Sequence, residues 1–187
     1  AEALAALAKE TEASRVLTVA GDVTDPELAP GVVSAAVERF GAVHGLVNNA
    51  GIVRAAMIDK MSLATWNEVL NVHLTGAFHF LKATGVHLIE RAKAGDTAPG
   101  AIVNISSDAG RRGTIGQINY GAAKSGMLGL TMSAAREWAR HGIRVNSVCF
   151  GVIETRMTEV ARSEKFRDTF LAQIPMGRWS TPEEVAP

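Results

Sequence analysis

The sequence predicts an α/β fold, a doubly wound parallel sheet in a three-layer α/β/α arrangement, and three observations predict it. Short apolar runs alternate four times with longer helical patterns. The run at residues 101–105 (AIVNI) is nearly continuously apolar, as expected for a strand that is buried on both faces. The chain has 187 residues, of which 47% are hydrophobic and 20% charged, which is enough for one sizeable core. We therefore expect a single domain over residues 1–187.

The first part of the chain should supply two strands and a helix. Residues 16–19 (VLTV) are strand-like. A helix is expected from about Pro26 to Phe40, because apolar residues recur there at helical spacing. Residues 45–47 (GLV) then form a short buried strand.

A long helical segment should follow. Ser62 is a helix-capping residue, and the amphipathic pattern behind it reaches about Arg91. Residues 95–100, with a glycine at each end, indicate a loop. Residues 101–105 (AIVNI) are a nearly continuous apolar run, which indicates the third strand.

The last strand–helix alternation begins in a glycine-rich loop over residues 110–116. This loop should lead into a helix from about Asn119 to His141, and residues 143–148 (IRVNSV) should form the fourth strand. No internal repeat or low-complexity tract interrupts the pattern.

Polar residues follow each predicted strand. Ligands of doubly wound sheets bind outside the carboxyl ends of the strands, which lie at one edge. The sequence therefore places four groups at that edge: Asp22, the run Asn48–Gly51, the run Ser106–Asp108, and Gly151 with Thr155.

Tyr120 and Lys124 are four residues apart in a predicted helix, so their side chains should share one face. An ammonium beside a phenol favours the phenolate, and we expect it to lower the pKa of Tyr120 from about 10 toward a useful acid–base range. The pair alone could equally be an ordinary helix surface. Tyr120 is the only tyrosine of the chain, which favours the acid–base interpretation.

Two further polar residues complete this set of candidates. Ser107 follows an apolar strand thirteen residues before Tyr120, where its hydroxyl could donate to a substrate carbonyl or merely end the strand. Asn71 lies within a helical pattern, where asparagine is unfavourable, so its side chain either has a specific role or faces water.

Composition excludes several functions. Nineteen basic residues balance nineteen acidic ones, which argues against nucleic-acid binding. The single Cys149 fits a reducing compartment, and no signal peptide or membrane-length apolar run occurs, so we expect a cytoplasmic protein that does not bind membranes. The five histidines lack metal-ligand spacing, and no G-x-x-x-x-G-K-[ST] phosphate loop is present.

Together, the run Asn48–Gly51 with Asn71, Ser107, Tyr120 and Lys124 resembles the short-chain dehydrogenase/reductase family, whose fold is Rossmann-like. The resemblance implies that the tyrosine is the general acid–base. It also implies that the lysine lowers the tyrosine pKa and holds the nicotinamide ribose, that the serine polarises the substrate carbonyl, and that the asparagine anchors a water relay.

The resemblance further implies a cofactor, NAD or NADP, and a set of contacts to it. The adenine would lie near Asp22 and Val23. The adenine ribose would lie near Asn49, Ala50 and Gly51, and the carboxamide and pyrophosphate near Gly151, the backbone of Ile153 and the hydroxyl of Thr155. Tyr120 and Lys124 would contact the nicotinamide ribose, and relatives suggest a homotetramer.

The tracts Gly151–Thr158 and Ile174–Arg178 make the chain similar to 3-oxoacyl-(acyl carrier protein) reductases. The substrate would then be a small alcohol, a ketone or an acyl thioester. Two departures stand out: Phe150 replaces the usual proline, and no glycine-rich G-x-G-x-x-G turn is present. We therefore expect the first βαβ segment and the last strand of the sheet to lie outside this sequence.

Two alternatives stay open at this point. The chain could be a non-catalytic binding or oligomerisation module with vestigial site residues. It could also be an NAD-dependent sugar epimerase or dehydratase, which shares the Tyr–Lys pair but normally needs a larger C-terminal substrate domain.

Overall fold

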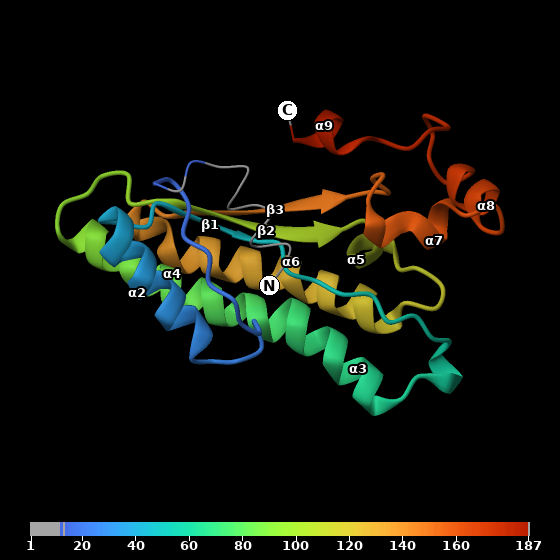
Figure 1. The fold of residues 1–187 in the computed structure, drawn as a ribbon, viewed down its shortest axis with the longest axis horizontal. Helices are drawn as coiled ribbons and strands as arrows, with labels where there is room; N and C mark the ends of the chain where they lie inside the picture. The colour runs from blue at the N-terminus through green and yellow to red at the C-terminus, as the bar shows by residue number, and fades with distance from the viewer. Residues whose placement is uncertain (1–11, 13, 187) are drawn as a thin grey trace.

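The computed structural model describes residue 12 and residues 14–186. Its centre is a parallel sheet of three strands, in the order β1 (Gly45–Asn48), β2 (Ala101–Ser107) and β3 (Arg144–Phe150) (Figure 1). Parallel strands with helical connections are the predicted α/β class. Strands β1, β2 and β3 correspond to the second, third and fourth expected strands.

Helices cover one face of the sheet. Helices α4 (Gly76–Lys93) and α6 (Ile118–Trp138) pack beneath the strands, and α2 (Leu28–Phe40) lies against α4 (Figure 1). The opposite face is more open, since Val47 of β1 is 63% exposed. The predicted helix at 26–40 is confirmed, although it begins at Leu28.

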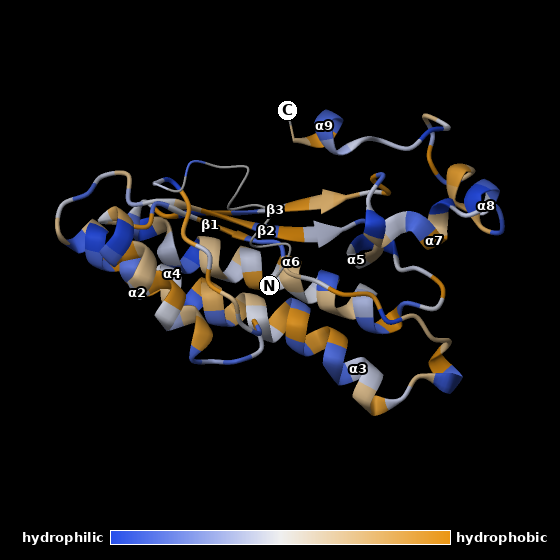
Figure 2. Ribbon diagram, in the orientation of Figure 1, coloured by the Kyte–Doolittle hydropathy of each residue, from blue (hydrophilic) through white to orange (hydrophobic). Residues whose placement is uncertain are grey.

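The core lies between the sheet and this helical layer. Its buried members are apolar side chains from α4, β2, α6 and β3 and the turn before β3: Leu81, Leu88, Ile102, Ala134, Ile143 and Val145. Trp138 packs against α4 at Gly85, where a Cβ would lie 2.3 Å from the indole. Figure 2 shows apolar stretches along the strands, with a pale blue carboxyl end on β2, above helices of mixed hydropathy. Burial of the apolar side chains between the two layers stabilises the fold.

The long helical segment is interrupted. Ser62 caps α3 (Leu63–Leu70) as predicted, because its side chain accepts a hydrogen bond from the amide of Thr65. A π-helical turn, Asn71–Thr75, then separates α3 from α4. Such turns insert one residue into the helical repeat and are frequent at functional sites.

The prediction of a strand at residues 16–19 is wrong for the described structure. These residues run as coil, and Leu17 and Val19 are 41% and 40% exposed. A strand needs a hydrogen-bonded neighbour, and no described segment pairs with this one. The β-rich composition of the segment therefore indicated its extended character but not its pairing.

The remaining helices are short. Helix α5 (Ala109–Arg112) follows β2, and α7 (Glu159–Arg162), α8 (Arg167–Leu171) and α9 (Pro182–Val185) follow β3. Helices α5, α7 and α8 lie near the carboxyl ends of the strands, whereas α9 lies above β3 in the view of Figure 1. Single 3-10 turns occupy Ile58–Lys60, Ala139–His141 and Arg156–Thr158. No helix in the described part of the chain is long and apolar enough to cross a membrane.

Candidate active site

The carboxyl ends of β2 and β3 lie side by side. Ser107 is in register with Phe150, and the amide of Asp108 donates to the Phe150 carbonyl at 2.9 Å. Asn48 ends β1 on the same edge and bonds to Asn104 of β2 at 2.8 Å. Three of the four polar groups that the sequence places at this edge therefore follow a strand. The strand expected before Asp22 is not present in the described residues.

Ser107 and Tyr120 meet at this edge. The Ser107 hydroxyl accepts a hydrogen bond from the amide of Ala109 at 3.2 Å, and its side chain lies close enough to Tyr120 to act on the pKa of the phenol. Tyr120 lies in the first turn of α6, directly after the fully buried Asn119. The Asn119 side chain accepts from the Tyr120 amide and donates to the carbonyls of Arg54 and Thr65, which fixes the start of α6.

Lys124 is buried one turn further along α6, with 4% of its surface exposed. Its Nζ lies 5.7 Å from the centre of the Tyr120 ring and donates to the Ile105 carbonyl at 2.6 Å. Burial lowers the pKa of Lys124 to about 8. Ser106 connects this turn of α6 to β2, because its Oγ donates a hydrogen bond to the Lys124 carbonyl at 2.8 Å.

The expected lowering of the Tyr120 pKa is not what the structure gives. Burial raises the pKa of Tyr120 above its ordinary value, and the hydrogen bond with Ser107 acts in the opposite direction without cancelling this effect. The ammonium of Lys124 is directed to the Ile105 carbonyl instead of the phenol oxygen. Spacing correctly placed the two residues on one face but did not reveal the burial that dominates the pKa.

Asn71 opens the π-helical turn, and its side chain is exposed. Its carbonyl accepts from the amide of Gly76, which is the bond that defines the turn. Within the described residues its side chain makes no hydrogen bond. Of the two sequence-based interpretations, the structure places the side chain in water, and its role in a relay stays a prediction.

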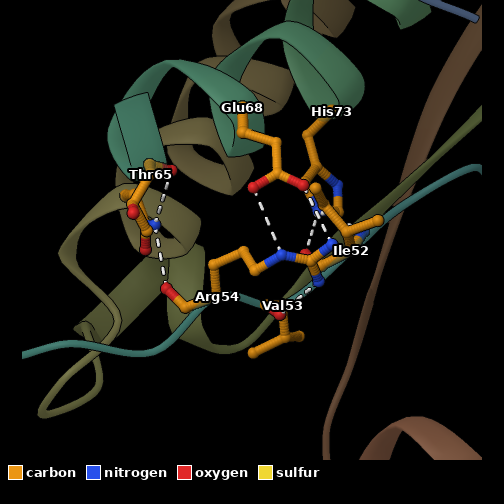
Figure 3. A network of polar contacts seen from close by, with 7 residues as sticks. Ile52, Val53, Arg54, Thr65, Glu68 and His73 are labelled. Atoms are coloured by element: carbon orange, nitrogen blue, oxygen red, sulfur yellow. Dashed lines mark hydrogen bonds and ion pairs between the residues drawn. The ribbon is translucent and has the colours of Figure 1, made fainter. Parts of the chain in front are cut away.

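His73 is the residue that the sequence reasoning missed. It lies on the same π-helical turn, is 1% exposed, and stands edge-on to Tyr120 with ring centroids 5.1 Å apart. Its Nε2 lies 2.7 Å from the carbonyl oxygen and 3.0 Å from the amide nitrogen of Ile52. Figure 3 shows His73 and Ile52 side by side. The available signal is a histidine in an otherwise mostly apolar stretch, which the spacing of metal ligands does not detect.

The loop after β1 approaches this cluster. Asn49 and Ala50 are exposed, whereas Gly51 lies against His73, where a Cβ would come within 2.3 Å of the imidazole. Any side chain at position 51 would push the loop away. An apolar groove between β1, α2 and α4 extends from Val23 to Asn49 and Ala50.

Val23 lines one end of this groove, and Asp22 precedes it in the chain. Asp22 is exposed, and both the amide and the hydroxyl of Thr24 donate to its Oδ1 at 2.9 Å. These two bonds lower the pKa of Asp22, so the carboxylate is charged near neutral pH. Val23 packs against the start of α4 at Gly76, and its carbonyl contacts His79.

The predicted cofactor contacts that follow β3 are held mainly by bonds to residues nearby in sequence. Gly151 is exposed after β3, and Ile153 pairs with Ser180 in an isolated parallel bridge. Thr155 is exposed and caps the turn Arg156–Thr158. The Ile153 carbonyl accepts a hydrogen bond from the Thr158 hydroxyl. A ligand could therefore bind the amide of Ile153, but it would compete with Thr158 for the carbonyl.

A parallel sheet with a serine, a tyrosine and a buried lysine converging at its strand ends is typical of α/β oxidoreductases. A family model described as enoyl-(acyl carrier protein) reductase matches residues 1–187. The chain belongs to the short-chain dehydrogenase/reductase family.

Several relatives are similar over most of this chain. The 3-oxoacyl-(acyl-carrier-protein) reductase of Thermotoga maritima is 42% identical over 187 residues, which cover 99% of this chain and 73% of that protein. An acetoacetyl-CoA reductase of Synechocystis is 40% identical over 180 residues, covering 96% and 72%. The crystal structure of a short chain dehydrogenase from Mycobacterium avium superposes with a TM-score of 0.75 at 40% identity, over 82% of this chain. The chain spans 53% of that solved structure.

Proposed function

We propose that the protein is an NAD(P)-dependent oxidoreductase that interconverts an alcohol and a ketone, with 3-oxoacyl thioesters as the favoured substrate class. The observation that carries the proposal is the meeting of Ser107, Tyr120 and Lys124 at the sheet edge. The activities of the relatives, 3-oxoacyl-(acyl-carrier-protein) reductase and acetoacetyl-CoA reductase, support the substrate class.

The residues present fit a nicotinamide cofactor. Within the described residues, Lys124 Nζ uses one of its three N–H donors on Ile105, which leaves two for ligand hydroxyls such as those of a ribose. Asn49, Ala50 and Gly51 offer small side chains and free backbone where a nucleotide must approach closely. When bound, the cofactor supplies or accepts the hydride.

The chain's own residues then handle the proton. The Ser107 hydroxyl donates to the carbonyl oxygen of the ketone, and the Tyr120 hydroxyl donates its proton to the same oxygen as the alcohol forms. A raised pKa keeps Tyr120 protonated, as an acid must be at the start of a reduction. Lys124 is charged below about pH 8 and keeps two N–H donors beside its bond to Ile105, so its role in the proposal is to hold the cofactor ribose next to Tyr120.

A direct assay tests the proposal. Purified full-length protein is mixed with acetoacetyl-CoA and either NADH or NADPH, and loss of reduced cofactor is followed by absorbance, with a simple ketone and a sugar nucleotide as comparison substrates. Thioester-dependent oxidation of one cofactor is the expected result. Turnover of the sugar nucleotide without net cofactor oxidation would support an epimerase instead, and no turnover with any substrate would support the binding-module alternative.

We also propose that the protein assembles as a homotetramer and acts in the cytoplasm. The small residues of α6 that could permit close helix pairing face outward: Ala122, Ser125, Gly129 and Ser133 are exposed. An apolar hollow formed by Leu74, Phe78 and Leu130 adjoins them at Gly126, and Phe78 is 49% exposed. Light scattering tests the oligomer, and a stable monomer at micromolar concentration would refute it.

A further inference from the structure

The helix that carries Tyr120 and Lys124 is attached to β2 by buried polar side chains to which the proposed reaction assigns no role. Helix α6 runs along the covered face of the sheet, beneath β2 and β3 (Figure 1). Successive side chains of a strand point to opposite faces, so alternate residues of β2 point toward the helices. Three of these residues, Ile102, Asn104 and Ser106, are 0%, 0% and 2% exposed, and two of the three are polar.

Asn104 lies at the centre of this contact. Its side-chain oxygen accepts a hydrogen bond from Asn48 at 2.8 Å, and its side-chain nitrogen donates to the Thr131 hydroxyl of α6 at 2.9 Å. The Thr131 hydroxyl in turn donates to the Met127 carbonyl, one turn earlier in α6, at 2.7 Å. A buried amide is costly unless it is hydrogen-bonded, and here both ends of the Asn104 amide have a partner.

A second bond of the same kind lies nearer the carboxyl end of β2. Ser106 Oγ donates to the Lys124 carbonyl at 2.8 Å, whereas Asn104 reaches Thr131 about two turns further along α6. The strand therefore holds the helix backbone at two places, once directly and once through the Thr131 hydroxyl. Two attachment points fix both the direction of the helix and its position along its own axis.

The apolar part of the same contact gives little resistance to sliding. The buried side chains of α6 include Ala123 and Ala134, which have one methyl group each, and Met127, which is unbranched and flexible. The hydrophobic effect is non-directional, so a small shift of such side chains over an apolar surface changes it little. Hydrogen bonds are directional and therefore select one axial position of the helix.

The other polar contacts of α6 within the described residues do not connect its backbone to β2. Asn119 holds the start of the helix to two carbonyls that lie outside the sheet. Lys124 Nζ reaches the Ile105 carbonyl, but through a flexible four-carbon side chain. The bonds of Asn104 and Ser106 are therefore the ones that relate the helix backbone to this strand.

We propose that Asn104, acting through Thr131, is a positioning residue that sets where α6 lies along β2 and thereby how far the Tyr120 hydroxyl lies from Ser107. A shift of α6 by one residue would move Tyr120 by about 1.5 Å along the helix axis. Misplacing a reacting group by about 1 Å can lower a rate about a hundredfold. The inference rests on the proposed function, because it takes proton transfer from Tyr120 as the step that needs this distance.

The experiment compares five variants of the full-length protein. Thr131→Val replaces the hydroxyl by a methyl group, Asn104→Leu removes the amide, and the double variant removes both partners. Thr131→Ser is the conservative variant that keeps the hydroxyl. Ser147→Ala is the matched control, because the Ser147 hydroxyl donates to the carbonyl of the same Asn104 at 2.9 Å, and this bond joins two strands instead of a strand and a helix.

Three quantities are measured for each variant: kcat with the substrate KM, the denaturant midpoint of unfolding, and the position of the Tyr120 ring. Tyr120 is the only tyrosine of this sequence, so labelling with 3-fluorotyrosine gives it a ¹⁹F resonance that Tyr120→Phe identifies. The resonance is recorded without substrate or cofactor. It reports the surroundings of the phenol independently of turnover.

We expect Thr131→Val and Asn104→Leu each to lower kcat about tenfold to a hundredfold with a smaller change in KM, and to move the Tyr120 resonance. Thr131→Ser and Ser147→Ala should keep the wild-type resonance and a kcat close to that of the wild type. The double variant should lose less of the denaturant midpoint than the two single losses together, because Asn48 keeps its bond to the Ala77 carbonyl and no buried polar group is left unpaired. Its kcat should nevertheless stay low.

Recovery of kcat together with the midpoint in the double variant would show that the pair only stabilises the fold, and the proposal would be wrong. A wild-type kcat and resonance in Thr131→Val, or an equal loss in Ser147→Ala, would also overturn it. The resonance tests the placement of Tyr120 whether or not the protein turns over the proposed substrate. Failure of the proposed function is therefore distinguishable from failure of this inference.

Discussion

The segment from β2 to α6 and the segment after β3 both carry predicted site residues, but they are held in different ways. Ser106, Asn119 and Lys124 are buried and bond across the fold to residues 18 to 65 positions away in sequence. Thr155, Arg178 and Glu184 are exposed. The side-chain hydrogen bonds in which they take part, which for Thr155 come from Thr158 and Arg162 to its backbone, reach no further than seven residues. Long-range buried bonds break only when the fold opens, whereas local exposed bonds can rearrange alone.

This contrast fits the proposed function, which needs both acid–base catalysis and substrate binding. Acid–base groups need fixed geometry, which the β2–α6 region provides through buried polar contacts. Residues 151–186 carry three helices of four or five residues each and exposed side chains such as Met157 and Met176, at 52% and 73%. Under the proposed function, we expect substrate choice to depend on this segment, because changes there would leave the buried groups of β2 and α6 in place.

Tyr120→Phe should have the largest effect. Only the hydroxyl is lost, so we expect turnover to fall at least a hundredfold while cofactor affinity and the unfolding midpoint change little. Steady-state kinetics and a cofactor titration measure this. A variant that keeps more than about a tenth of the wild-type rate would show that Tyr120 is not the proton donor.

Lys124→Met should separate activity from stability. Turnover and cofactor affinity should both fall, whereas the fold should become more stable at pH 7, because a buried ammonium is replaced by an apolar side chain of similar length. The gain is at most on the order of 3 kcal/mol, since each pKa unit corresponds to about 1.4 kcal/mol.

The pH dependence of this gain has a definite sign. The pKa of Lys124 is about 8 in the folded protein, below its ordinary 10.5, so the folded state loses its proton first as pH rises. Wild-type stability should therefore increase between about pH 8 and 10.5, and the advantage of Lys124→Met should shrink over that window. Denaturant unfolding at several pH values measures this, and an advantage that grows with pH would contradict it.

Asn119→Ala should lower stability by about 1–3 kcal/mol, because the carbonyls of Arg54 and Thr65 lose their donor in a buried place. Turnover should also fall, since the start of α6 carries Tyr120. Chemical denaturation gives the first effect and kinetics the second. An unchanged unfolding free energy would mean that long-range bonds do not stiffen this region.

Glu184→Gln should have the smallest effect. Hydrogen bonding to Arg178 and to the amide of Thr181 lowers the pKa of Glu184 to about 2, so its contribution is present above about pH 4.5 and is lost as pH falls through 2. The group is exposed and screened by salt. We expect unchanged global unfolding and faster hydrogen exchange only in α9, and a global destabilisation comparable with Asn119→Ala would overturn the contrast.

Local patterns in the sequence were sufficient for much of the fold. Apolar periodicity located α2, α4 and α6 and three of the strands, and the cap at Ser62 was read from residue type alone. These features depend on neighbours within a few residues, which a sequence displays directly. The expected strand at residues 16–19 failed because pairing depends on a distant partner.

By itself, the sequence determined the α/β class, the sheet edge that carries the site, and the spacing of Ser107, Tyr120 and Lys124. Only the tertiary structure decided how these groups behave. Burial, which raises the Tyr120 pKa and lowers that of Lys124, depends on all the segments that close around α6. The contact of His73 with Tyr120 likewise depends on a π-helical turn and a glycine that lie far from α6 in the sequence, and no local pattern encodes their meeting.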